Sequence, residues 1–360
     1  MNTERLLQEL AEAPGISSIE DEPRKIMRMH LQQLSDRVYQ DGLGSVIGVQ
    51  NEDADGIKIQ FAAHMDEVGF MVKIVDEHGY LRLQPIGSMW THVLLGQRMD
   101  VKADNGRIYA GVIGSPASHG LPKEVKERTM AMNDLYLDIG ASSQLQVYKA
   151  GIRPGCMVFP HGLFTKMLDN DRVMCKALDD RAGCAAELIA FEYLHGRYNA
   201  PLYCAGTIQE EPGLRGARTA TDVIHPDLSL AVDTTVAGDT PADHNTCRLG
   251  GGAVLSMIDS NTIAHRGLIR YAETIAAEKK IPIQYAVFKG GGTDSGNIHK
   301  SFEGILSMTI SIPIRYMHSM QSIISMHDVE ACAELMSAMV LGMNQTKYKQ
   351  LLNGWEDDDD

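Results

Sequence analysis

The sequence predicts an α/β protein in which a mostly parallel sheet is covered by helices and carries an inserted small β-barrel-like domain. Two observations support this fold. Strand and helix patterns alternate at the start of the chain and again after Lys176. Between about Gly69 and Pro160, short β-like runs separated by glycines replace that alternation. A chain of 360 residues with 44% hydrophobic content can form two such units.

We therefore expect the α/β domain to comprise residues 1–68 and 166–347, and the inserted β domain to comprise residues 69–165. Residues 348–360 are expected to form a disordered acidic tail, because they end in the run from Glu356 to Asp360.

The elements follow in order. Helical spacing from Thr3 to Leu34 is interrupted at Gly15, so two helices are expected, followed by a strand pair at 38–39 and 45–49 and a strand at 58–63. The inserted domain has β-like runs at 70–74, 80–83, 98–103, 107–113, 135–139 and 157–159, and a helical run at 142–149. After it, helices are expected at 181–195, from 214, at 262–280 and at 328–344, with Asp328 as N-cap, and strands at 201–207, 228–232, 283–287 and 305–311.

Composition excludes several classes of function. The net charge of −14 and the lack of a basic patch disfavour a nucleic-acid partner. No apolar stretch of about 18 residues or more predicts a membrane span, and no signal-peptide pattern is present, so we expect a cytoplasmic protein. The six cysteines show no CxxC pairing, which favours buried free thiols in a reducing compartment.

His64 and Asp66 directly follow the predicted strand at 58–63. Side chains two residues apart in extended chain point the same way, so Asp66 can orient the imidazole of His64 from behind. Histidines that bind metals usually donate their second ring N–H to such an acceptor. The alternative is a single histidine whose hydrogen bonds are made by an adjacent turn.

Asp179 and Asp180 lie between an apolar run and the helix predicted from Arg181. The helix dipole favours carboxylates at a helix N-terminus, so both aspartates could act as N-caps. A carboxylate that bridges two cations also needs a rigid corner of this kind. One aspartate could therefore cap while the other bridges.

Glu210 and Glu211 follow the strand at 201–207. Adjacent acids repel each other unless cations or protons intervene. One could bind a metal while the other stays free as a general base; simple exposure to solvent is the alternative. Asp233 follows the predicted strand at 228–232, and His318 follows the segment at 311–316, beyond the strand predicted at 305–311. Because ligand sites of α/β sheets lie beyond the carboxyl ends of strands, these residues are candidates for the same site.

The glycine run at 290–292 with Thr293 lacks the lysine of a phosphate-binding loop. We expect it to line the rim of the site, where backbone N–H groups or Thr293 could hold a substrate.

Six ordered motifs together resemble the di-metal aminopeptidases that assemble as tetrahedral dodecamers, a group with glutamyl aminopeptidases and frv-operon-type proteins. The motifs are AAHMDEVGF (62–70), KALDDRAGC (176–184), QEEPGLRGA (209–217), AVDTT (231–235), GGGTDSG (290–296) and RYMHS (315–319). The resemblance spans nearly the whole chain. One departure is Pro212, where the family usually has an aliphatic residue.

The resemblance implies a site with two divalent metal ions per subunit, zinc or cobalt foremost and manganese as a further choice. It implies that His64 and Asp233 bind one ion, that Glu211 and His318 bind the other, and that Asp179 bridges them. It also implies that Glu210 is the general base and that Asp66 orients His64. The expected reaction is hydrolysis of the N-terminal bond of peptides by a water that the two metals activate.

The same resemblance implies that the α/β domain is catalytic and that the inserted domain makes dimers, which assemble into a homo-oligomeric dodecamer. Two alternatives remain open. A glycoside hydrolase of the endoglucanase type would use paired carboxylates but leave His64 and His318 without a role. A non-catalytic assembly protein would hold structural metals in closed sites.

Overall fold

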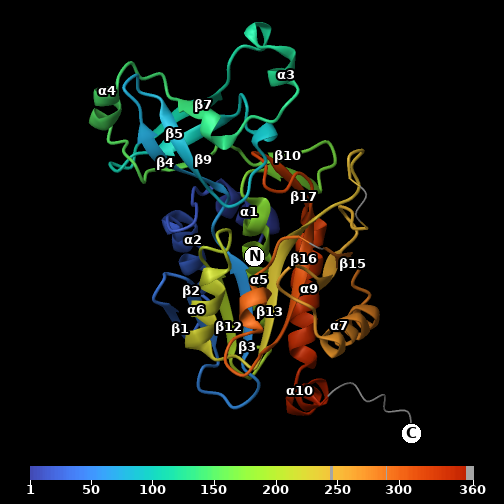
Figure 1. The fold of residues 1–360 in the computed structure, drawn as a ribbon. Helices are drawn as coiled ribbons and strands as arrows, with labels where there is room; N and C mark the ends of the chain where they lie inside the picture. The colour runs from blue at the N-terminus through green and yellow to red at the C-terminus, as the bar shows by residue number, and fades with distance from the viewer. Residues whose placement is uncertain (244–245, 289, 354–360) are drawn as a thin grey trace.

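The computed structural model describes residues 1–243, 246–288 and 290–353, which form an α/β domain and a closed β-barrel (Figure 1). The main sheet has the strand order β1-β2-β12-β3-β13-β16-β14-β15. Its strands are β1 (Arg37–Gln40), β2 (Val46–Gln50), β3 (Ile59–His64), β12 (Leu202–Thr207), β13 (Leu228–Val236), β14 (Ala253–Ile258), β15 (Ile283–Val287) and β16 (Leu306–Ile314).

The centre of this sheet is parallel and its edges contain antiparallel pairs. Strands β12, β3, β13 and β16 pair in parallel, whereas β1 and β2 form an antiparallel edge and β14 runs antiparallel to β16. Every residue of β3, β12 and β16 is buried. Strands buried on both faces are expected to be apolar throughout, as the sequences of these three largely are. The predicted mostly parallel sheet is thus confirmed.

Helices cover both faces of the sheet. Along β3, Phe61 and Ala63 pack into the large core that includes helices α1, α2, α5, α7 and α9, whereas Ala62 packs on the other face with Ala217 of α6 and Ile298 of α8. This alternation follows from the two-residue period of a strand. The helices are α1 (Thr3–Glu12), α2 (Asp21–Leu31), α5 (Leu178–Leu194), α6 (Arg215–Ile224), α7 (Arg266–Lys279), α8 (Ser295–Ile298), α9 (Met326–Gly342) and α10 (Gln345–Leu352).

The inserted domain is a closed barrel with the strand order β4-β5-β8-β7-β6-β9, and all of its neighbouring strands are antiparallel. Alternate residues such as Phe70 and Val72, or Met99 and Val101, fill its core. Figure 1 shows it at the end of the molecule opposite α10. Its elements are β4 (Gly69–Val75), β5 (Leu81–Ile86), β6 (Arg98–Lys102), β7 (Ile108–Gly114), α3 (Lys123–Lys126), β8 (Tyr136–Asp138), α4 (Gln144–Lys149) and β9 (Met157–Pro160).

Several details differ from the sequence prediction. Helix α9 begins at Met326, so Asp328 is not its N-cap; the Asp328 carboxylate instead accepts the N–H groups of Gly250 and Gly252, at 2.7 Å each. Residues 348–352 of the expected tail belong to α10, and residues 354–360 lie outside the described residues. Strand β14 was not predicted, nor was the small sheet of β10 (Thr165–Lys166), β11 (Arg172–Cys175) and β17 (Ser322–Ser325).

Among the described residues, no helix combines the length and the apolar character needed to cross a bilayer.

Candidate metal centre

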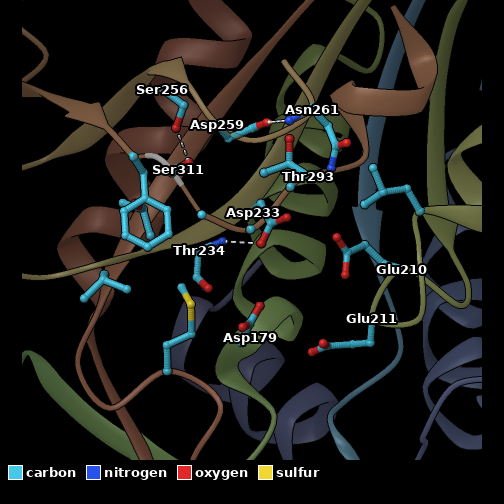
Figure 2. A pocket seen from close by; sticks show the side chains of 18 of the residues that line it. Asp179, Glu210, Glu211, Asp233, Thr234, Ser256, Asp259, Asn261, Thr293 and Ser311 are labelled. Atoms are coloured by element: carbon cyan, nitrogen blue, oxygen red, sulfur yellow. Dashed lines mark hydrogen bonds between the residues drawn. The ribbon is translucent and has the colours of Figure 1, made fainter. Parts of the chain in front are cut away.

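Five separate segments place acidic and histidine side chains in one cavity of about 270 Å³. His64 ends β3, Asp233 lies within β13, and Asp179 lies at the start of α5. Glu210 and Glu211 follow β12, and His318 follows β16. Figure 2 shows Asp179, Asp233, Glu210 and Glu211 pointing toward one another. Because β3, β12, β13 and β16 are adjacent in the sheet, their ends converge although these residues are far apart in sequence.

The first half of the centre surrounds His64, whose side chain is 2% exposed. Its Nε2 lies 3.5 Å from Asp179 Oδ1, 3.8 Å from Glu210 Oε2 and 3.9 Å from Asp233 Oδ1. One ligand atom each from His64, Glu210 and Asp233 fits within 4.8 Å of the others. A divalent cation could be held in this half.

The second half surrounds His318, whose side chain is 32% exposed. Its Nε2 lies 3.2 Å from Asp179 Oδ2 and 3.5 Å from Glu211 Oε1. Ligand atoms of these three residues also lie within 4.8 Å of one another. Asp179 therefore faces both histidines, with a different carboxylate oxygen toward each.

The tandem aspartates differ in their contacts. Asp180 Oδ1 accepts the N–H of Gly183 at 3.0 Å, which makes Asp180 a cap for α5, and the Asp179–Asp180 peptide bond is cis. Asp180 can also be grouped with Asp179 and Asp233 around one ion. Asp179, however, is the aspartate within 4 Å of both histidine rings.

Electrostatics indicate a shortage of positive charge in the cavity. Burial raises the pKa of Glu210 well above its ordinary value, and the Asp233 and Glu211 carboxylates raise it further. Burial likewise raises the pKa of Glu211 to about 7. For His318, burial would lower the pKa, but the Glu211 and Asp179 carboxylates outweigh burial and raise it to about 9.

The residues fit divalent cations. Glu211 Oε1 and Asp180 Oδ2 are buried without a hydrogen-bond partner among the described residues. Crowded carboxylates with two imidazoles are ligands that zinc, cobalt and manganese accept. Cations here would relieve the repulsion among acids that otherwise have to share protons.

Asp66 supports both halves from behind. His64 Nδ1 lies 3.0 Å from the backbone carbonyl of Asp66 and 3.5 Å from its carboxylate, so the nearer oxygen is the carbonyl. The carboxylate instead accepts the N–H groups of Glu210, at 3.0 Å, and Glu211, at 3.2 Å. Asp66 therefore holds the loop that carries both glutamates, a contact that the sequence did not suggest.

Two further residues of this support were missed. Ser17 donates its hydroxyl to the Asp66 carboxylate, and Glu20 Oε1 accepts the N–H of Gln209 at 3.1 Å. Both side chains are almost fully buried although they lie in the connection between α1 and α2. The available signal was the polar residues Ser17, Ser18 and Glu20 shortly after Gly15, in a segment that the sequence pattern identifies only as a helix break.

A buried ionic network fixes the same connection to α5. Lys176 Nζ lies 2.8 Å from Glu67 Oε1, and Glu67 also accepts the N–H of Gly15 at 3.0 Å. Arg181, which is fully buried, donates to the backbone carbonyls of Met65 and of the N-terminal segment. Removing one member would leave a charge buried without its partner, which is strongly destabilising.

The glycine run and Thr293 line the cavity, as predicted, but the Thr293 hydroxyl lies 2.7 Å from that of Thr309 and is engaged there. Pro212 lies in a tight turn in which the Glu210 carbonyl accepts the N–H groups of Gly213 and Leu214. The turn needs no N–H from position 212, so proline fits it.

An α/β sheet with an inserted barrel, and a cavity with two imidazoles and several carboxylates at its strand ends, are features typical of a metallohydrolase. The sequence matches the M42 glutamyl aminopeptidase family over residues 44–335, which is most of its length, and the chain belongs to this family of metallo-aminopeptidases.

Two curated relatives illustrate the family. FrvX of Escherichia coli (strain K12), which is named as an aminopeptidase, is 36% identical over 96% of this chain and 97% of its own. The lysyl aminopeptidase of Pyrococcus furiosus is 33% identical over 93% and 96% of the two chains.

Solved structures agree with these matches. A TET aminopeptidase from a marine-sediment archaeon superimposes with a TM-score of 0.93 at 31% identity, covering 97% of this chain and 98% of its own. The TET1 peptidase of Pyrococcus horikoshii, which can assemble into a tetrahedron or a large octahedral shell, gives 0.84 at 28% identity over 95% and 100%; another structure, PhTET1-12s, is a dodecamer. A Thermotoga maritima structure named an endoglucanase gives 0.77 at 26% identity over 96% and 99%.

Proposed function

We propose that this aminopeptidase holds two divalent cations and uses Glu210 as the general base in hydrolysis of the N-terminal bond of peptides. The observation that carries the proposal is Asp179, whose two oxygens face the two histidines at 3.5 and 3.2 Å. With Asp179 as the bridge, His64 and Asp233 complete one ligand set, and Glu211 and His318 complete the other.

Glu210 is then the acid that neither ligand set requires. Its Oε2 lies 3.8 Å from His64 Nε2, so it faces the reaction centre, and burial favours its protonated form. A buried carboxylate at this place can take a proton from the attacking water and pass it to the leaving amine. Bound cations would supply polarisation of the peptide carbonyl and a lower pKa for water. Asp66 keeps Glu210 in place through its backbone N–H.

The two alternatives are less compatible with the geometry. Glycosidases need carboxyl groups about 5–9.5 Å apart around the scissile bond. Here, instead, each of the two imidazoles belongs to a group with two carboxylates whose ligand atoms lie within 4.8 Å of one another, which gives both histidines a role. A structural metal would be enclosed by protein, whereas all five proposed ligands line an open cavity.

We also propose that the catalytic domain comprises residues 1–68 and 166–347, that the inserted barrel mediates dimers, and that these assemble into a dodecamer in the cytoplasm. The assembled relatives support the oligomer. All six cysteines are unpaired and buried, which supports a reducing compartment. Light scattering at native conditions tests the assembly, and a monomeric mass would contradict it.

The deciding experiment for the mechanism is Glu210→Gln, assayed on aminoacyl substrates with zinc, cobalt or manganese and with a chelated control. We expect kcat to fall by roughly 10²–10⁴ while two metals per subunit remain bound, because only the proton acceptor is lost. Glu77→Gln, at an exposed glutamate of the barrel, is the matched control. Full activity of Glu210→Gln with metals bound would show that Glu210 is not the base.

A further inference from the structure

A second cavity, of about 520 Å³, adjoins the metal centre. It shares Ser88, Val236, Met317 and His318 with the first cavity. The two cavities are therefore two parts of one cleft, and they meet at the second half of the metal centre.

The second cavity has largely apolar and aromatic walls from three connections. Trp90 and Val93 come from the barrel, Ala237 follows β13, and Tyr316 precedes His318. Trp90 is 65% exposed and Tyr316 is 56% exposed. A large apolar surface exposed beside a catalytic cavity is typical of a ligand-binding groove.

Trp90 is exposed yet held in place. Its ring lies edge-on to that of His92, with centroids 4.6 Å apart, and His92 Nε2 lies 2.6 Å from the Thr129 hydroxyl. Four residues after Trp90, Leu94 is fully buried in the barrel core. The indole thus has a defined ring contact and lies near a residue anchored in the barrel core, both of which reduce the conformational entropy lost when an apolar group binds to it.

The chemistry of the reaction assigns the two cavities different parts of a substrate. An aminopeptidase holds a single residue on one side of the scissile bond and the rest of the peptide on the other. The smaller cavity contains the candidate metal centre, and residues of β14, β16 and the glycine run also line it. The larger cavity adjoins the first at His318 and is lined by the exposed aromatic residues Trp90 and Tyr316, so it suits the longer part.

We propose that the second cavity binds the leaving part of the peptide, with the side chain of the second residue packed on Trp90. This inference rests on the proposed aminopeptidase function. The preferred substrates are peptides whose second residue is large and apolar or aromatic. Trp90 is a specificity-determining residue contributed by the inserted barrel.

The test uses the full-length, metal-loaded oligomer and dipeptides that share one N-terminal residue, chosen as the one hydrolysed fastest in an aminoacyl-amide panel. Phenylalanine is compared with glycine at the second position. We expect kcat/KM to favour phenylalanine by about tenfold in the wild type, because burying an aromatic side chain stabilises the bound peptide. In Trp90→Ala the preference falls to about twofold or less, mainly through KM. Trp90→Phe should retain part of the preference for phenylalanine that Trp90→Ala loses.

Tyr148→Ala is the matched control, since Tyr148 is an exposed aromatic of the barrel on α4 and lines neither cavity. It should keep the wild-type preference. An unchanged preference in Trp90→Ala, or an equal loss on both dipeptides, would overturn the assignment of Trp90 while leaving the aminopeptidase function intact. If the metal-loaded wild type hydrolyses neither amides nor dipeptides, the proposed function and this inference fail together.

Discussion

The two halves of the metal centre contain similar side chains but are built differently. His64 ends a fully buried central strand, and its side chain is 2% exposed. His318 lies on a turn after β16 with a left-handed backbone (φ +55°), and its side chain is 32% exposed. Left-handed backbone is uncommon for residues other than glycine, so the turn must be held by its surroundings. The first half thus depends on the sheet and the second on a supported loop.

The supports differ in the same way. Behind His64 lie Asp66 and Ser17, which are both buried. Beside His318, the Ser319 hydroxyl lies 2.7 Å from the carbonyl oxygens of both Tyr316 and Gln321, to either of which it can donate. The Gln321 amide donates to the His161 carbonyl next to the barrel. We infer that the His64 half is coupled to the stability of the fold, whereas the His318 half can change with little effect on it.

The largest expected effects come from removing each histidine. His64→Ala and His318→Ala should each lower activity by more than about 100-fold, because each removes a proposed metal ligand, and loss of a ligand exceeds the effect of altering its support. In the metal-free protein, His64→Ala should lower the free energy of unfolding by about 1–3 kcal/mol, because it leaves buried acceptors without a partner. His318→Ala should cost less than about 1 kcal/mol.

Denaturant unfolding and metal analysis of both variants check this prediction, with the exposed His78→Ala as control. If His318→Ala destabilises the metal-free protein as much as His64→Ala does, the distinction between the two halves is wrong.

A smaller effect is expected from the N-terminal support. Glu20→Ala removes the acceptor for the N–H of Gln209 and should lower kcat by about 10-fold, with both metals retained, because the loop of Glu210 becomes less ordered. Glu20→Gln keeps an acceptor oxygen and should lose less. Glu22→Gln, at a more exposed position of α2, is the control. Equal activity of Glu20→Ala and the wild type would show that this contact does not position the loop.

The smallest effect concerns pH and applies to the chelated, metal-free protein. The pKa of His318 is raised to about 9, since Glu211 and Asp179 outweigh burial, and an unfolded histidine titrates near 6.5. The protonated ring therefore stabilises the folded state fully below about pH 6.5, and this contribution is lost as pH rises through about 9.

Because the ring is one-third exposed, solvent screens the interaction, and we expect a decline on the order of 1 kcal/mol. Unfolding titrations between pH 6 and 10 should show this decline in the wild type and a smaller one in His318→Asn. Parallel curves for the two proteins would contradict the assignment of the decline to His318.

Much of the fold could be predicted from local pattern, and the exceptions have physical reasons. The run Ile283–Val287 was predicted as a strand with the bounds that β15 has. Strand β14 was missed because it follows a glycine-rich stretch and its half-buried end mixes polar and apolar residues. Asp328 resembles an N-cap in sequence, yet its carboxylate is used by two glycine N–H groups from a distant loop. A local sequence pattern does not reveal that N–H groups from a distant loop compete with the helix N-terminus for the same carboxylate.

In the site, too, some features could be predicted from the sequence and others depend on tertiary contacts. The six sequence motifs indicated the family and the candidate acids and histidines of the site. They could do so because the side chains that can bind a metal follow directly from residue type, and the order of the motifs along the chain is typical of the family. The contact of Ser17 with Asp66, the contact of Glu20 with Gln209 and the two oxygens of Asp179 that face different histidines were decided by the tertiary structure. So was the cleft that joins His318 to Trp90 of the barrel. These features join segments far apart in the chain, and only the packing of sheet, helices and barrel fixes the distances between them.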